Sequence, residues 1–154
     1  MFPFPIIFLD IDGVLIPYGK DSRTLHAPCL AALVSILSQT SARIVVSSSW
    51  RLYNMPELMA MFRVVMLPTG ETIADRVIGT TPWSDQLLDD NIVSRCRPKE
   101  IRAWVDEHQF TGTAVIIDDE TLHGVPYPHV KTQLYTGLTE NHVSAIVRYL
   151  TETE

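Results

Sequence analysis

Most of what can be inferred about this chain starts from Ile6–Val14, a stretch with the sequence IIFLDIDGV. An uninterrupted apolar run without polar alternation is typical of a strand buried on both faces, as in a parallel sheet. The run ends in Asp10 and Asp12, so two carboxylates reach the carboxyl edge of the sheet, where open α/β folds place their ligands. Two like charges this close are costly unless a cation or a shared proton relieves them. The stretch therefore implies a cation, although Gly13 breaks the strand and can turn the second carboxyl elsewhere.

Composition limits the class of protein. The length of 154 residues predicts one domain over residues 1–154, and the hydrophobic content of 46% excludes a disordered chain. The net charge of −6 argues against nonspecific nucleic-acid binding but allows a local basic groove. Two cysteines are too few for a disulfide framework, and the apolar start lacks the basic region of a signal peptide. We expect a cytoplasmic protein that makes no membrane contact.

Extended and helical patterns alternate along the chain. We expect strands after the first at residues 44–46, 64–67, 114–117 and 130–134. Helices are predicted to begin near Pro28, Glu57, Pro98 and Thr139. Residues 68–97 are polar and weakly periodic, which indicates a long loop with short helical pieces that forms a lid. The alternation predicts an α/β fold with a three-layer, doubly wound parallel sheet, Rossmann-like and without a large cap domain.

Three of these apolar strands end in residues that can do chemistry. The first ends in Asp10 and Asp12, the strand at 44–46 runs into Ser47–Ser49, and the strand at 114–117 runs into Asp118 and Asp119. The carboxyl ends of parallel strands meet at one edge of a sheet. Their coincidence there predicts a functional site.

Taken in order, the segments FLDIDGV, IVVSSSW, RPKEIRAWV and VIIDDE resemble the four motifs of the haloacid dehalogenase (HAD) superfamily. The resemblance covers Ile6 to Glu120. The forms SSSWR, PKEIRAWV and TGLTE are similar to the HAD domain of Swiss Army Knife RNA repair proteins. The resemblance implies the HAD fold and a phosphatase that works through an aspartyl phosphate.

The resemblance also implies roles for the acids. Asp10 is expected to be the nucleophile, since a carboxylate is competent for covalent catalysis once its charge is neutralised. Asp12 resembles the general acid that protonates the leaving oxygen and then activates water. Asp118 and Asp119 are expected to hold Mg²⁺ together with Asp10 and the backbone carbonyl of Asp12, because Mg²⁺ prefers oxygen ligands.

The remaining motif positions imply contacts to phosphate. A hydroxyl of the second strand is expected to hydrogen-bond the transferring phosphoryl group, with Ser47 the first choice and Ser48 the second. Lys99 matches the motif cation that steadies the negative charges, and the nearby cations Arg95, Arg97 and Arg102 are alternatives.

Trp50 and Arg51 directly follow the serines. Arg51 either binds a substrate phosphate with its guanidinium or pairs with an acid. Trp50 could stack on a base, but it is expected to pack in the core, since large aromatic side chains are mostly buried.

The segments between the motifs are too short for a large cap domain, and this indicates the size of the substrate. Capless members of the superfamily typically act on exposed or macromolecular phosphates, so we expect a phosphomonoester phosphatase for a terminal phosphate on RNA or DNA. A protein partner could supply nucleic-acid affinity. One alternative is a phosphatase for nucleotides or sugar phosphates, with residues 68–97 folded over the site. Others are a phosphoacceptor receiver, which the order of the acidic motifs disfavours, and a binding module without turnover.

Overall fold

A five-stranded parallel sheet forms the centre of the computed structural model, which describes residues 3–21, 23–50, 54–82 and 97–152. The strand order is β3-β2-β1-β4-β5, and each neighbouring pair is parallel. The strands are β1 (Ile6–Leu9), β2 (Arg43–Val46), β3 (Val77–Thr80), β4 (Ala114–Asp118) and β5 (His129–Lys131). The predicted α/β class with a parallel sheet is confirmed.

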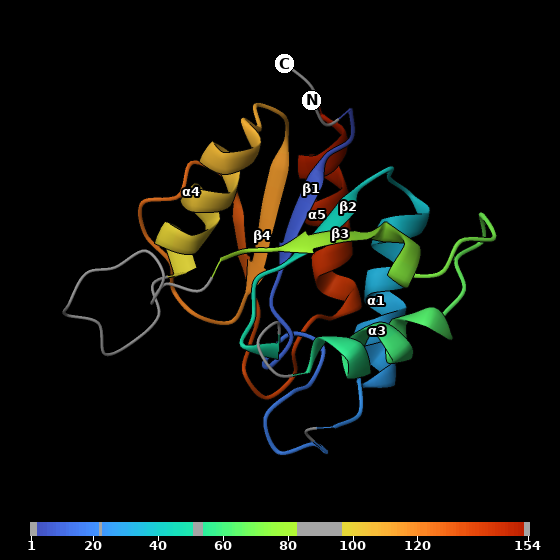
Figure 1. Cartoon of the computed structure of the whole chain (residues 1–154). Helices are drawn as coiled ribbons and strands as arrows, with labels where there is room; N and C mark the ends of the chain where they lie inside the picture. Colours follow the sequence, from blue (N-terminus) through green and yellow to red (C-terminus); the bar gives the residue numbers. More distant parts are fainter. Residues whose placement is uncertain (1–2, 22, 51–53, 83–96, 153–154) are drawn as a thin grey trace.

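Helices cover both faces of this sheet, as Figure 1 shows, with α4 on one side and α1 and α5 on the other. They are α1 (Ala27–Ser38), α3 (Met55–Arg63), α4 (Arg97–His108) and α5 (Glu140–Thr151), with a short 3₁₀ helix, η1 (Ala74–Arg76). Alternate residues of a strand point to opposite faces. Accordingly Ile7 and Leu9 join the core under α1 and α5, whereas Ile6 and Phe8 pack beneath α4. The three predicted layers are present, and the described residues contain no cap domain.

One predicted strand was wrong, and one strand of the sheet was not predicted. Residues 64–67 form no strand: α3 runs to Arg63, and Met66 makes only an isolated antiparallel bridge to Thr72. Two of the four apolar side chains there lie on the surface, with Val64 78% and Met66 59% exposed. The third strand is instead β3, inside the segment predicted to be a loop, because a half-exposed edge strand lacks a continuous apolar run.

The last strand, predicted at 130–134, is shorter and covers His129–Lys131. Its predicted second half belongs to a tight turn in which Gln133 bridges to Gly137. The lid predicted for residues 68–97 falls partly on 83–96, which lie outside the described residues.

The predicted helix starts agree with the structure to within two residues. Thr139 caps α5 as expected, because its hydroxyl oxygen accepts a hydrogen bond from the amide of Asn141 at 3.3 Å. Pro28 lies in the first turn of α1, and Cys29 beside it is fully buried. Within the described ranges, no helix has the length and apolar character that crossing a membrane requires.

Candidate active site

A row of polar side chains crosses the carboxyl edge of the sheet, one position beyond its last apolar row. The amides of Thr81, Ser47 and Asp10 donate to carbonyls of the neighbouring strands at 3.0, 2.8 and 3.0 Å. Asp118 continues the row, since Leu9 pairs with the residue before it. All four side chains are buried. Aligned residues of a parallel sheet point to the same face, so this row faces α4, opposite to the apolar row before it.

Three aspartates gather at the centre of this edge. Asp10, Asp118 and Asp119 each offer a carboxylate oxygen, and these oxygens lie within 4.8 Å of one another. Asp10 is 3% and Asp118 1% exposed. Burial raises the pKa of the Asp10 carboxyl well above its usual value and also raises that of Asp118. A buried carboxylate stays charged only beside a compensating positive charge.

Arg97, at the start of α4, supplies part of that charge. Its Nη1 lies 2.6 Å from Asp118 Oδ2 and 3.4 Å from Asp10 Oδ2, and the side chain is only 5% exposed. Burial lowers the pKa of this guanidinium, but the carboxylates of Asp10 and Asp118 more than offset that effect and raise it. The arginine therefore stays charged and holds the two acids together.

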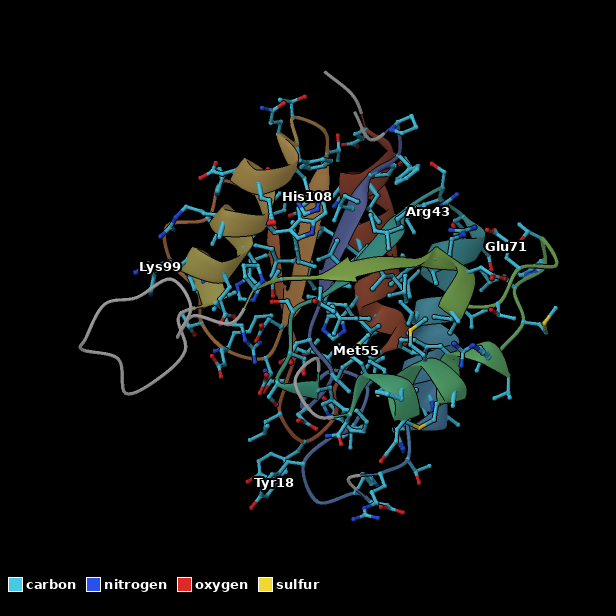
Figure 2. The ribbon with its side chains drawn as sticks, viewed as in Figure 1. Tyr18, Arg43, Met55, Glu71, Lys99 and His108 are labelled. Atoms are coloured by element: carbon cyan, nitrogen blue, oxygen red, sulfur yellow. The ribbon has the colours of Figure 1, made fainter. Side chains whose placement is uncertain are left out.

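The sequence had favoured Lys99 over Arg97 as the motif cation. In the structure Arg97 shares the buried side of α4 with Ile101 and Trp104, which contact the sheet. Lys99 is half-buried and stands off this side; Figure 2 shows it at the outer side of α4. Helical spacing could have identified Arg97, because it lies four positions before Ile101 and seven before Trp104. Residues at these spacings share one face of a helix. The role of Lys99 stays a prediction.

The residues present fit a divalent cation. With all three carboxylates ionised, the one guanidinium of Arg97 leaves two negative charges, which one divalent ion would neutralise. Carboxylate oxygens are the ligands that hard divalent ions prefer. Backbone amides already orient the acids: Ile11 donates to Asp10 Oδ1 at 2.8 Å, and Glu120 donates to Asp118 Oδ1 at 2.9 Å. The buried cluster can therefore hold a metal ion.

Gly13 allows the third aspartate to approach. Its φ is +81°, and a Cβ atom placed on it would lie 2.5 Å from both Cγ and Oδ2 of Asp119. Any other residue would be strained and would displace this carboxylate. The carbonyl of Gly13 accepts a hydrogen bond from the buried Thr132 hydroxyl at 2.7 Å, which fixes the turn in place.

Asp12 stands apart from the cluster. It is exposed, and its Oδ1 accepts a hydrogen bond from Trp50 Nε1 at 3.3 Å. Trp50 itself is 5% exposed, so its predicted place in the core is confirmed, but its contact with Asp12 was not foreseen. The two acids of the first motif thus occupy different environments. Metal binding by the backbone carbonyl of Asp12 remains a prediction.

The serines after β2 also differ. Ser47 Oγ is buried and has no hydrogen-bond partner within the described part of the chain, whereas Ser48 Oγ accepts from the Trp50 amide at 3.3 Å. Thr81, which sequence reasoning missed because β3 was read as a loop, likewise has a buried hydroxyl without a described partner. Ser47 is therefore the serine with a hydroxyl available to a ligand. Arg51 lies outside the described residues.

Comparison with known proteins agrees with the motifs. A family model described as "HAD domain in Swiss Army Knife RNA repair proteins" matches residues 6–143. No curated protein and no solved structure gave a match. The resemblance predicted from the four motifs is confirmed.

Replacing Gly13 by alanine should remove stabilisation by a divalent cation, because the new methyl group displaces Asp119. The matched control is Gly70→Ala, where φ is +93° but nothing lies within 4 Å of the added Cβ. Each change should cost roughly 1–3 kcal/mol from backbone strain. Thermal unfolding with and without Mg²⁺ measures the difference: Mg²⁺ should raise the Tm of wild type and Gly70→Ala only. An equal rise in Gly13→Ala would contradict the cluster.

Replacing Arg97 by glutamine should lower the free energy of unfolding by about 3 kcal/mol or more in the absence of metal, because two buried carboxylates lose their partner. Arg102→Gln, on the exposed side of the same helix, should cost less than about 1 kcal/mol. Urea unfolding with and without Mg²⁺ should recover more stability in Arg97→Gln than in wild type. No dependence on the cation in either protein would refute the compensation of charge.

Proposed function

Since the chain belongs to the HAD superfamily, among the HAD domains of Swiss Army Knife RNA repair proteins, we propose that it is a Mg²⁺-dependent phosphomonoester phosphatase. The family indicates a phosphatase-like hydrolase. The finer assignment adds an aspartyl-phosphate intermediate on Asp10 and a terminal phosphate of a nucleic acid as the substrate.

The unequal surroundings of the two acids in the first motif carry this proposal. Asp10 is buried in the cluster with Asp118 and Asp119, whereas Asp12 is exposed and bound to Trp50. A nucleophile needs its charge neutralised nearby, and a general acid needs access to the leaving group. Asp10 meets the first requirement and Asp12 meets the second.

In the proposed first step, a carboxylate oxygen of Asp10 bonds to phosphorus while the bond from phosphorus to the leaving oxygen breaks. Asp12 gives its proton to that oxygen. In the second step Asp12 takes a proton from water, whose oxygen bonds to phosphorus as the bond to Asp10 breaks. Inorganic phosphate leaves, and Asp10 and Asp12 return to their starting states.

Asp10, Asp118 and Asp119 would hold Mg²⁺, whose positive charge offsets the charge of the phosphoryl oxygens when it is bound. Arg97 keeps Asp10 and Asp118 together through its ion pairs. The unpartnered hydroxyl of Ser47, next to Asp10 in the row, would donate to a phosphoryl oxygen. Ser48 and Arg51 remain candidates for further substrate contacts.

A terminal phosphate on RNA or DNA is the proposed substrate. The family description names RNA repair proteins, and the described residues include no cap that would restrict the site to small molecules. The exposed position of Asp12 suits a large leaving group.

Asp10→Asn should abolish phosphate release from end-phosphorylated oligonucleotides and from p-nitrophenyl phosphate, because the amide is a poor nucleophile. Asp12→Asn should slow turnover by roughly 10²–10⁴-fold, the usual contribution of a general acid–base group, and should accumulate a phosphoenzyme. Initial rates and intact-protein mass spectrometry measure both.

Asp106→Asn, an exposed aspartate on α4, serves as the control and should behave as wild type. A folded, Mg²⁺-loaded wild type that is inert on all phosphoesters tested would refute the activity. Equal rates for Asp10→Asn and wild type would refute the nucleophile.

A further inference from the structure

A hollow opens beside Asp12. Its volume is about 250 Å³, and the residues that line it are Asp12, Gly13, Ile16, Pro17, Tyr18, Gly19, Lys20 and Leu134. Asp12, the proposed general acid, is one of these lining residues, so the hollow adjoins the place where the leaving oxygen would be protonated. A group attached to the leaving oxygen would therefore reach it first.

Two exposed tyrosines form a corner at the rim of this hollow. Tyr18 is 63% and Tyr135 68% exposed, and their ring centroids lie 5.4 Å apart at an angle of 88°. Figure 2 shows Tyr18 at the lower edge of the molecule, on the side where β1 ends. Tyrosine is enriched at binding interfaces, because its ring offers apolar surface and its hydroxyl stays in water. The rings present apolar surface directly beside the site.

Hydrogen bonds hold this corner in shape. The amide of Tyr18 donates to the carbonyl of Leu134 at 2.8 Å, which ties the two loops that carry the tyrosines. On one side Asp12 bridges to Ile16, and on the other Gln133 bridges to Gly137. Both rings thus stand on loops that are already closed, so little ordering is needed when a ligand binds.

We propose that this corner binds the nucleobase of the nucleotide whose phosphate the site removes, an inference that rests on the proposed function. Stacking on tyrosine suits any base, since every base has a flat π face. The base carries no charge, so it can lie near Asp12 without repulsion. The exposed ammonium of Lys20, at the same rim, attracts the sugar–phosphate backbone. The substrate is therefore a nucleotide, free or at the end of a chain.

The test compares kcat/KM for adenosine 5′-monophosphate with that for ribose 5-phosphate, which carries the same phosphate without a base. In Tyr18→Ala and Tyr135→Ala the kcat/KM ratio of adenosine 5′-monophosphate to ribose 5-phosphate should decrease by roughly 5- to 150-fold. This is the range for loss of one stacked base. Tyr18→Phe, which keeps the ring, should retain the ratio. Tyr149→Ala, an exposed tyrosine on α5 that lines a different hollow, should also retain it. An unchanged ratio in both alanine variants would overturn the proposal.

A binding experiment separates this proposal from the proposed reaction. Calorimetry with the Asp10→Asn protein and Mg²⁺ measures affinity without turnover. Adenosine 5′-monophosphate should bind more weakly to Asp10→Asn/Tyr18→Ala, whereas the affinity for inorganic phosphate should change by less than about twofold. Equal loss for both ligands, or for neither, would overturn the base-binding role even if phosphatase activity is present. Inactive wild type would overturn the proposed function alone.

An end-phosphorylated dinucleotide identifies the source of the base. Weaker binding of this dinucleotide to the Tyr18→Ala protein would also support base binding by the tyrosine corner. Tighter binding than the mononucleotide, with dependence on Lys20, assigns the site to a nucleic-acid end; equal binding assigns it to free nucleotides.

Discussion

The mutual repulsion of carboxylates that the fold forces together constrains the rest of this structure. The register of β1 with β4 sets Asp10 beside Asp118 at the sheet edge, where both side chains are buried. Neither could remain charged there without Arg97, and one arginine neutralises only part of the cluster. The glycine turn after β1 admits a third carboxylate, and Arg97 at the start of α4 together with the proposed Mg²⁺ would balance the charge.

Much of the sheet could be predicted because β1, β2 and β4 are continuous apolar runs, the pattern of strands buried on both faces. The edge strand β3 could not, because its side chains are half-exposed and Gly79 interrupts it. Residues 64–67 were mistaken for a strand since their apolar side chains look like a buried run in sequence. Only the tertiary structure shows that Val64 and Met66 lie on the surface.

The acids of the site could be located from sequence because each directly follows an apolar strand. The residues that contact these acids could not be predicted from sequence, because they lie far away along the chain. Trp50 reaches Asp12 across 38 positions of the chain, and the approach of Asp119 to Gly13 depends on how two loops pack. The aromatic corner is a further case, because Tyr18 and Tyr135 have no shared pattern in sequence. Their proximity arises only when the loops after β1 and β5 meet.

We infer that Asp10, Asp118 and Asp119 share one divalent ion. A crystal structure of the protein grown with Mn²⁺, with anomalous diffraction used to locate the metal, would show whether they do. We predict a single anomalous peak at the carboxyl edge of the sheet, with oxygen ligands from Asp10, Asp118 and Asp119. A peak elsewhere, or an ordered edge with these carboxylates pointing apart and no metal between them, would contradict the account.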